Sequence, residues 1–286
     1  MKICRTIEEM RETLANYRRA GESIGLVTTM GALHEGHIAL VHAARERHAR
    51  VATTIFVNPT QFGEAADLAA YPRTEAQDLE MFEAAGVDVV LLPQVDEIYP
   101  DGEETIVETT SLGNMLHGAV RPGHFRGVTT VVTKLFNIVR PDAAYFGEKD
   151  YQQLAVIRRM TGDLLFGIDI VGVPTVREAD GLAMSSRNAR LSPEDRDAAP
   201  VLNRALEAAQ AIALPGVPVE EIARTIRDTV AAEPRARLEG LDMVDPATFR
   251  PIITGPLDGP VGIMISARFG QGDHAVLLID QREIHP

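Results

Sequence analysis

Short apolar runs alternate with helical patterns along the first part of the chain, and this alternation most constrains the fold. The runs are rich in β-branched residues and apolar at nearly every position, which is typical of strands buried on both faces of a sheet. They lie at Ile24–Thr29, Val51–Val57, Val87–Leu92, Ala143–Phe146 and Ile168–Val173. Helix-like stretches separate them, at about 36–49, 73–85, 126–139 and 149–162. The alternation predicts βαβ units, right-handed crossovers and a parallel sheet with helices on both faces.

The pattern changes after Val173. Ser192 and Pro193 are typical of a helix start, because serine caps helices and proline fits their first turn, so an Ala-rich helix is expected from there to about Ala213. A further helix is expected over Val219–Ala232, and short antiparallel strands over Gly240–Val244, Val261–Phe269 and Ala275–Ile279. We therefore expect a domain boundary near residue 175. The predicted fold class is α/β, with a Rossmann-like parallel sheet in domain 1–175 and a smaller α+β domain with a short antiparallel sheet at 176–286.

Composition limits the classes of partner. The 286 residues include 28 Lys and Arg against 41 Asp and Glu, a formal charge of −13 that argues against nucleic acid or an anionic membrane as the main partner. The only cysteine, Cys4, can form no intramolecular disulfide or CxxC site. The first residues lack the apolar core of a signal peptide, and Thr6 with Glu9 predicts a capping box instead. With no apolar run long enough to span a bilayer, we expect a cytoplasmic protein.

The stretch TTMGALHEGH, residues 28–37, carries two histidines directly after a predicted strand. His34 and His37 are three residues apart, whereas the ligands of a zinc-protease helix are four apart. A metal site of another kind and a pair of solvated loop histidines remain possible from this stretch alone. A strand, a glycine turn and a helix start also form the geometry in which backbone N–H groups and the helix dipole face an anion. Histidines in that position can donate hydrogen bonds to phosphate oxygens.

Three more polar stretches lie at the ends of predicted elements. GEKDYQQ, residues 147–153, places Lys149 at a strand-to-helix turn, where its compact charge suits a phosphoryl group. AMSSRN, residues 183–188, offers two hydroxyls and a guanidinium as a phosphate clamp. FVNPTQFG, residues 56–63, offers Asn58 and Gln61, whose uncharged amides suit a small substrate with hydroxyl and carboxylate groups. Each stretch alone is equally compatible with a solvated helix start, a hinge loop or an ordinary turn.

Taken together, these stretches resemble the pantoate–β-alanine ligase (pantothenate synthetase) family of the HIGH-motif nucleotidyltransferase superfamily. The resemblance covers nearly the whole chain and is densest from Val27 to Asn188. It rests on six ordered motifs: MGALHEGH, FVNPTQFG, YPRT, RPGHFRGV, FGEKDYQQ and READGLAMSSRN. The chain departs from the family at Thr28, where proline is common, and at Thr60, where an apolar residue is common.

The resemblance implies an ATP-dependent, two-step ligation. Pantoate and ATP would give pantoyl-adenylate and pyrophosphate, and β-alanine would then displace AMP. The residues implied to act on the triphosphate are His34, His37, Lys149, Ser185, Ser186 and Arg187, together with a Mg²⁺ ion. The residues implied to bind the rest of the nucleotide are Gly147 and Asp150 at the ribose and Val176 and Met184 at the adenine. The residues implied to bind pantoate are Gln61 and Gln153, with Asn58 and Tyr71 near the reacting end. Met30 is implied to pack on the apolar part of pantoate and is also counted among the nucleotide-binding residues.

Further expectations concern the periphery of this site. Asp78 is a candidate Mg²⁺ ligand, and Arg121, His124 and Arg126 are expected in a loop close to the site. Because water would hydrolyse an acyl-adenylate, we expect the domain 176–286 to act as a lid. The family also implies a homodimer.

Alternative functions are less consistent with the residues. A nucleotidyltransferase acting on a phosphorylated substrate would keep HxGH but would not be expected to pair Gln61 with Gln153. A tRNA synthetase is disfavoured by the charge of −13 and by the lack of an anticodon-binding extension. A catalytically silent nucleotide-binding or regulatory protein on the same fold is disfavoured by four intact residues: His34, His37, Lys149 and Arg187.

Overall fold

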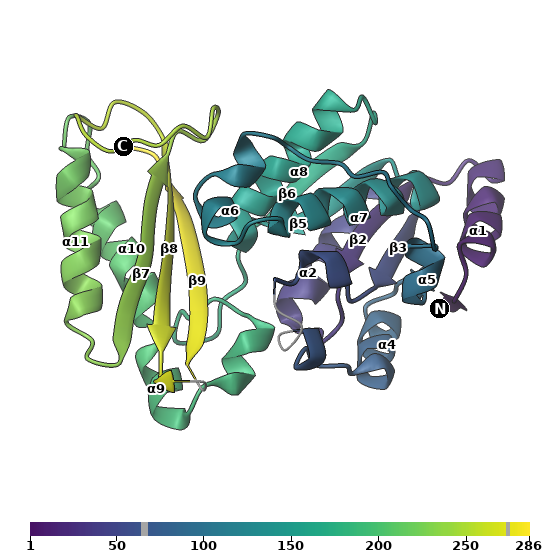
Figure 1. Ribbon diagram of the computed structural model, residues 1–286, viewed down its shortest axis with the longest axis horizontal. Helices are drawn as coiled ribbons and strands as arrows, with labels where there is room; N and C mark the ends of the chain where they lie inside the picture. Colours follow the sequence, from purple (N-terminus) through teal and green to yellow (C-terminus); the bar gives the residue numbers. More distant parts are fainter. Residues whose placement is uncertain (64–67, 273–274) are drawn as a thin grey trace. The chain divides into compact units, whose positions relative to one another are not determined.

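The computed structural model describes residues 1–63, 68–272 and 275–286. The chain forms two compact units, the first made of Met1–Gly147 and Gln152–Pro174 and the second of Glu148–Tyr151 and Thr175–Pro286. Their elements are labelled in Figure 1. Within the described ranges, no helix combines the length and the apolar character needed to cross a membrane.

The first unit contains a six-stranded sheet in the order β1-β4-β3-β2-β5-β6. Every neighbouring pair in it is parallel, which confirms the predicted α/β fold class. The strands are β1 Lys2–Cys4, β2 Ile24–Thr29, β3 Arg50–Ile55, β4 Val89–Leu91, β5 Ala143–Gly147 and β6 Asp169–Val173. Five of them coincide with the predicted runs to within two residues at every end, and β1 was not predicted.

Helices cover both faces of this sheet, as predicted. The longer helices are α1 Ile7–Arg19, α2 Glu35–Arg47, α4 Glu75–Ala84, α7 His124–Val139 and α8 Tyr151–Asp163. Side chains of a strand alternate between faces, so Leu26 of β2 belongs to the apolar cluster built with α1, α7 and α8, whereas Val27 belongs to the cluster built with α2 and α4. The shorter helical segments are α5 Val95–Ile98, α6 His117–Val120, and the 3₁₀ turns η1 Pro59–Gln61, η2 Leu112–Asn114 and η3 Glu148–Asp150. The capping box predicted at Thr6 and Glu9 opens α1.

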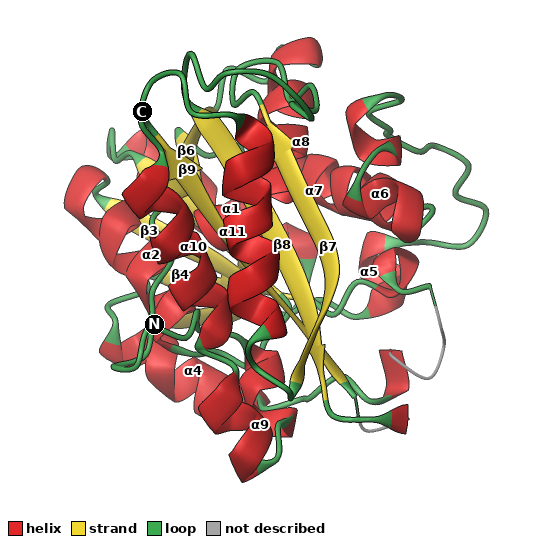
Figure 2. Ribbon diagram, turned by 90° about the vertical axis from the view of Figure 1, so that its left-hand side faces the viewer, coloured by secondary structure: helices red, strands yellow, loops and turns green. Residues whose placement is uncertain are grey.

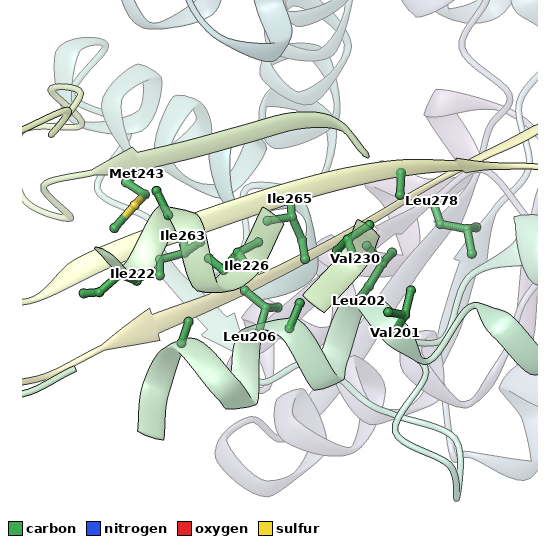
Figure 3. Packing of buried hydrophobic residues seen from close by; sticks show 14 of the residues in the cluster. Val201, Leu202, Leu206, Ile222, Ile226, Val230, Met243, Ile263, Ile265 and Leu278 are labelled. Atoms are coloured by element: carbon green, nitrogen blue, oxygen red, sulfur yellow. The ribbon is translucent and has the colours of Figure 1, made fainter. Parts of the chain in front are cut away.

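The second unit has a three-stranded antiparallel sheet, in agreement with the prediction, in the order β7-β8-β9. Its elements are the 3₁₀ turn η4 Ser186–Arg190, the helices α9 Pro193–Ala198, α10 Val201–Ile212 and α11 Val219–Ala231, and the strands β7 Ala236–Val244, β8 Val261–Phe269 and β9 Val276–Ile284. Figure 2 shows α10 and α11 lying along the strands. Apolar residues of the two helices, including Leu206 and Ile226, pack against Ile263 and Ile265 of β8 (Figure 3). This unit therefore has a core of its own.

The single Ala-rich helix predicted from Ser192 to about Ala213 is wrong in one respect. The segment forms two helices, α9 and α10, separated at Ala199 and Pro200. Proline has no N–H to donate to the preceding turn and its ring crowds that turn, so the helix is interrupted there. The predicted start is correct, because the Ser192 side chain accepts a hydrogen bond from the Asp195 N–H and Pro193 occupies the first turn.

Candidate active site

Three of the predicted site stretches follow strands of the parallel sheet. β2 lies between β3 and β5, and the chain passes from β2 through α2 to β3 on one side while β5 flanks it on the other. Ligands of open α/β sheets bind at such a reversal of strand order, beyond the carboxyl ends of the strands. Met30–His34 follows β2, Phe56–Gln61 follows β3 and Gly147 ends β5. The first unit thus places these stretches at the edge of the sheet where a ligand is expected.

His34 and His37 cap the start of α2 in a reciprocal way. The Nδ1 atom of His34 accepts a hydrogen bond from the Gly36 N–H at 3.1 Å, and the Nδ1 atom of His37 accepts from the His34 N–H at 3.3 Å. The two ring centroids are 4.1 Å apart. A neutral imidazole that accepts at Nδ1 carries its proton on Nε2. Both rings therefore present an Nε2–H donor at the N-terminus of α2, where the helix dipole favours an anion.

The loop that leads into His34 is held by Asp78 of α4. The Asp78 carboxylate accepts hydrogen bonds from the Ala32 N–H at 3.0 Å and from the Leu33 N–H at 2.8 Å. Its exposed fraction is 1%, and the Thr74 hydroxyl lies 3.1 Å from both carboxylate oxygens. Ala32 has a φ of 51°, in the left-handed region, which costs about 1–3 kcal/mol in a residue with a Cβ. This arrangement argues against the Mg²⁺ role predicted for Asp78, since its oxygens already accept hydrogen bonds inside the protein.

Gln61 and Met30, both predicted to bind pantoate, lie together in the first unit. The Gln61 amide nitrogen is 3.0 Å from the Met30 sulfur, and the Gln61 side-chain oxygen accepts a hydrogen bond from the Asn58 amide at 3.0 Å. The backbone carbonyl of Gln61 is 2.9 Å from Nδ1 of His124. An uncharged amide thus stands beside an apolar thioether, a combination that suits a ligand with polar and apolar parts. His124, which was expected in a loop, is instead the first residue of α7, and from there it supports this turn.

Asn58 serves as a support for Gln61. Its exposed fraction is 1%, and its amide nitrogen also donates to the Gly127 carbonyl at 3.1 Å. Its oxygen accepts from the Thr60 hydroxyl at 3.0 Å and from the Tyr99 hydroxyl at 2.8 Å. Burial raises the pKa of the Tyr99 phenol, so that hydroxyl keeps its proton and donates. With its hydrogen-bonding capacity used inside the protein, Asn58 fits a positioning role better than the substrate contact predicted for it.

Thr60, a departure from the family pattern, belongs to the same cluster, because its hydroxyl also lies 3.2 Å from that of Tyr99. Thr28, the other departure, continues β2 and pairs with Thr54 of β3.

Tyr99 was not predicted as part of the site. It follows a short helix far along the chain from Asn58, and only the fold brings them together.

Replacement of Gly127 by alanine is expected to disturb the turn that carries Gln61. A Cβ at position 127 would lie 2.5 Å from the Thr60 carbonyl oxygen and 2.8 Å from the Gln61 backbone nitrogen. Such overpacking costs about 1–3 kcal/mol, and the displaced turn should raise KM for pantoate. Thermal unfolding and steady-state kinetics would measure the two effects.

Gly162→Ala is the matched control, because Gly162 also lies inside a helix but a Cβ there would meet no atom within 4 Å. This variant should be neutral, or more stable by about 0.4–1 kcal/mol. Equal thermal stability and equal KM for pantoate in Gly127→Ala and Gly162→Ala would contradict the assignment of a packing role to Gly127.

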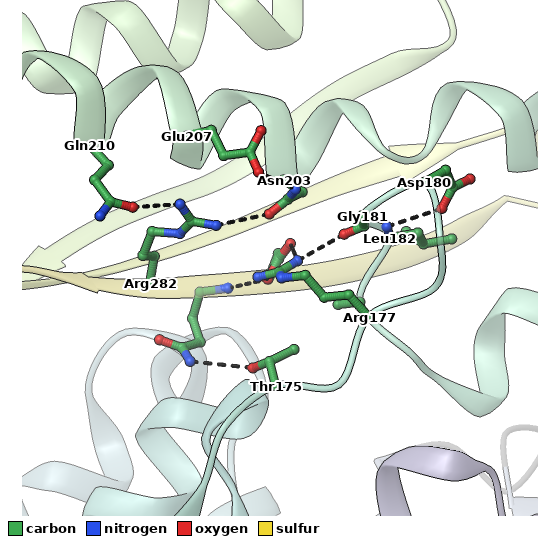
Figure 4. Close-up of polar contacts among 12 residues, drawn as sticks. Thr175, Arg177, Asp180, Gly181, Leu182, Asn203, Glu207, Gln210 and Arg282 are labelled. Carbon is green, nitrogen blue, oxygen red and sulfur yellow. Dashed lines mark hydrogen bonds and ion pairs between the residues drawn. The ribbon is translucent and has the colours of Figure 1, made fainter.

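The second unit carries the predicted adenine-binding residues on a hairpin. Val176 and Met184 face each other across it, with the Met184 N–H donating to the Val176 carbonyl at 2.9 Å. Arg177 spans its base, donating to the Gly181 carbonyl at 3.0 Å (Figure 4). It also donates to both oxygens of Asp280 in β9 at 2.7 and 2.9 Å. Asp280, which was not predicted, therefore anchors the hairpin to the sheet.

The predicted phosphate clamp follows the hairpin directly. The Ser185 hydroxyl accepts a hydrogen bond from the Arg187 N–H at 3.2 Å and caps η4, which starts at Ser186. The Asn188 amide donates to the Ala183 carbonyl at 3.1 Å and to Glu178 at 3.0 Å, so the turn is tied back to the hairpin. The backbone is thereby fixed, while the Arg187 side chain is exposed.

The remaining predicted residues are distributed as follows. Lys149 and Asp150 lie in η3 and belong to the second unit, and Lys149 is half-buried. Gly147 ends β5, and a Cβ there would meet no atom within 4 Å, so the backbone is open to approach. Gln153 is half-buried in the first turns of α8, and the ring of Tyr71 lies 5.7 Å from that of Phe62.

The structure thus brings together Met30 with Gln61 and His34 with His37 in the first unit, and Val176 with Met184 and Ser185 with Arg187 in the second. Within the residues it describes, no group of three or more His, Cys, Asp or Glu side chains could hold a metal ion.

Comparison with known proteins identifies the family. A family model described as Pantoate-beta-alanine ligase matches residues 2–283. The pantothenate synthetase of Sinorhizobium medicae (strain WSM419) is 51% identical over 288 residues, covering 100% of this chain and 97% of that protein. The crystal structure of pantothenate synthetase from Thermus thermophilus covers 100% of both chains with a TM-score of 0.92 at 45% identity. The pantoate-β-alanine ligase from Francisella tularensis, complexed with "Beta-gamma ATP and Beta-alanine", covers 99% of this chain and 97% of its own, with a TM-score of 0.79 at 34% identity. The chain therefore belongs to the pantoate–β-alanine ligase family.

Proposed function

We propose that this protein condenses (R)-pantoate with β-alanine at the expense of ATP, giving pantothenate, AMP and pyrophosphate through a pantoyl-adenylate. The observation that carries the proposal is the family match over residues 2–283. The Francisella tularensis relative is described as complexed with "Beta-gamma ATP and Beta-alanine", which correspond to two of the three substrates proposed here. The site geometry supports the proposal independently, because the His34 and His37 donors and the Gln61 amide follow neighbouring strands, β2 and β3, of the same sheet.

The first step joins pantoate to AMP. A carboxylate oxygen of pantoate attacks the α-phosphorus of ATP, and the bond from this phosphorus to the oxygen bridging to the β-phosphate breaks. A carboxylate is already ionised at neutral pH, so the step needs no general base. It needs in-line positioning and stabilisation of charge on the phosphates. The Nε2–H groups of His34 and His37 are suited to this stabilisation because they are oriented in advance by their Nδ1 hydrogen bonds.

Lys149, Ser185, Ser186 and Arg187 supply further positive charge and donors in this proposal. Lys149 lies in η3. Ser186 and Arg187 lie in η4, which Ser185 caps, so regular backbone holds these side chains. Gln61, supported by Asn58, would orient pantoate through its hydroxyl and carboxylate groups, with Met30 against its apolar part. Val176 and Met184 would border the adenine, and Gly147 and Asp150 the ribose.

Mg²⁺ is proposed to enter with the nucleotide as MgATP. The described side chains do not fit a protein-held ion, because none of their clusters supplies three ligating groups and the Asp78 carboxylate is occupied by N–H and O–H donors. Magnesium commonly reaches active sites held mainly by substrate phosphates and water. No step is therefore assigned to a metal bound by this chain's own residues.

The second step transfers the acyl group. The amine of β-alanine attacks the acyl carbon, a C–N bond forms, the C–O bond to AMP breaks and the amine releases a proton. The adenylate must meanwhile be protected from water. We propose on this chemical ground that residues 176–286 act as a lid. Small-angle scattering should then show compaction on addition of ATP and pantoate. The homodimer and the cytoplasmic location likewise stay predictions.

Pantoate-dependent exchange of labelled pyrophosphate into ATP, measured without β-alanine, tests the adenylate route. Exchange is expected because formation of the adenylate is reversible and needs only the first two substrates. Omission of pantoate is the control, since exchange without it would indicate another acceptor. Folded protein that shows no exchange with ATP, Mg²⁺ and pantoate present would contradict the mechanism.

A further inference from the structure

We infer that Asp78 is a positioning residue of the active site, which holds residues Gly31–Leu33 in the shape that presents His34 and His37. The inference rests on the proposed function, and it replaces the magnesium role expected for this carboxylate. Asp78 lies in the first turn of α4, and Gly31–Leu33 lies between β2 and α2. The two segments are joined by side-chain-to-backbone hydrogen bonds.

Each oxygen of the Asp78 carboxylate accepts a hydrogen bond from one of two successive backbone N–H groups. Oδ2 accepts from Ala32 at 3.0 Å and Oδ1 accepts from Leu33 at 2.8 Å. The Thr74 hydroxyl, at 3.1 Å from each oxygen, holds the carboxylate from the side of α4. With 1% of its surface exposed, this buried polar group depends on these donors for its stability. Both oxygens are thus committed to holding the loop.

The backbone of the loop is strained at Ala32, a residue with a Cβ in the left-handed region. Gly31 and Ala32 have φ values of 82° and 51°, so two consecutive residues are in the left-handed region. The N–H groups of Ala32 and Leu33, which follow this turn, both donate to the Asp78 carboxylate. A Cβ at Gly31 would lie 2.9 Å from Oδ2 of Asp78, so this glycine lets the carboxylate approach.

The anchored residues lead directly into the histidine caps. Leu33 immediately precedes His34, whose N–H donates to Nδ1 of His37 and whose Nδ1 accepts from Gly36. The direction of the His34 N–H, and therefore the His37 tautomer, depends on the path of the backbone through Ala32 and Leu33. Loss of the anchor should disorient both Nε2–H donors. A displacement of about 1 Å at reacting groups can lower turnover about a hundred-fold.

Asp78→Asn is the central test, because asparagine keeps the size but replaces one acceptor oxygen with an NH₂ group facing a backbone N–H. The variant should exchange pyrophosphate with kcat lowered about a hundred-fold. Its KM for pantoate should change less than about two-fold, since Gln61 is held by Asn58 and not by Asp78. The Mg²⁺ concentration for half-maximal exchange should also stay within about two-fold of that of the wild type, because no ligand is lost.

A readout on the unliganded protein separates positioning from metal binding. In ¹⁵N-labelled protein without nucleotide, the amide signals of Ala32 and Leu33 should shift and exchange faster with solvent in Asp78→Asn. Glu75→Gln is the matched control, since it removes one negative charge from the same helical turn at a position whose partner is Arg5 on the surface. It should leave the kinetics and both amide signals unchanged.

Three results would overturn the inference. The first is folded Asp78→Asn with wild-type kcat. The second is a half-maximal Mg²⁺ concentration raised more than about ten-fold with unmoved amides, which would indicate a metal ligand. If Asp78→Asn does not fold, Thr74→Val decides, since it removes the hydroxyl donor and leaves the carboxylate. Thr74→Val should lower kcat by several-fold. An unchanged kcat in this variant is the third result that would overturn the inference. Absence of exchange in the wild type would instead refute the proposed function.

Discussion

Replacement of Lys149 by alanine is expected to lower kcat for adenylate formation by about a hundred- to a thousand-fold. Lys149 is a half-buried ammonium group in η3, directly after the strand that ends at Gly147. In the proposed role it neutralises charge that moves onto the leaving pyrophosphate, so its contribution is larger in the transition state than in the bound substrate. The loss should therefore be seen mainly in kcat. Pyrophosphate exchange and pantothenate formation should fall together.

Lys2→Ala is the matched control for Lys149→Ala. It removes the same charged group from an exposed position in β1, outside the predicted site, and should leave both rates unchanged. Lys149→Arg should recover only part of the rate, because a planar guanidinium cannot replace a compact ammonium at a fixed phosphate contact. Near-normal turnover of Lys149→Ala, in protein with wild-type thermal stability, would remove Lys149 from its assigned role.

Much of the fold could be predicted because the decisive signals are local. Strands buried on both faces read as continuous apolar runs, and β2 was predicted at both of its ends. β1 was missed because three residues are too few to show a period, and its pairing with β4 is set by residues far along the chain. The interruption at Pro200 was missed although its cause is local, since the helical composition on either side outweighed one proline.

The sequence predicted which chemical groups the site contains, but not how the fold holds them. The motifs identify side chains that can bind phosphate or pantoate, but they do not show which groups are held by the protein itself. Asp78 meets Ala32 across 46 positions of sequence, and Asn58 meets Tyr99 across 41, so no local pattern marks these contacts. Asp280 gave one usable signal, a lone carboxylate directly after the apolar run Val276–Ile279. A charge in such a strand requires a partner, which the fold supplies as Arg177.

Replacement of Asp280 by alanine is therefore expected to destabilise the second unit by about 3–5 kcal/mol, because it leaves the Arg177 guanidinium without its carboxylate. The Asp280 side chain is 1% exposed and binds Arg177 through two hydrogen bonds. The chain has no tryptophan, so hydrogen exchange followed by mass spectrometry is the suitable measurement. Amides of β9 and of the 176–184 hairpin should exchange more than about a hundred-fold faster.

Glu239→Ala is the matched control, since this carboxylate of β7 also pairs with arginines of the sheet, Arg237 and Arg268, but at the surface. Exposed pairs contribute about 0–1 kcal/mol, so exchange in the same segments should change little. Because the hairpin carries Val176 and Met184, Asp280→Ala should also raise KM for ATP, whereas Glu239→Ala should not. Equal exchange in the two variants would show that the Arg177–Asp280 pair does not anchor the hairpin. Faster exchange without a change in KM would separate the stability of the hairpin from nucleotide binding, and Val176 and Met184 would then lose their place at the adenine.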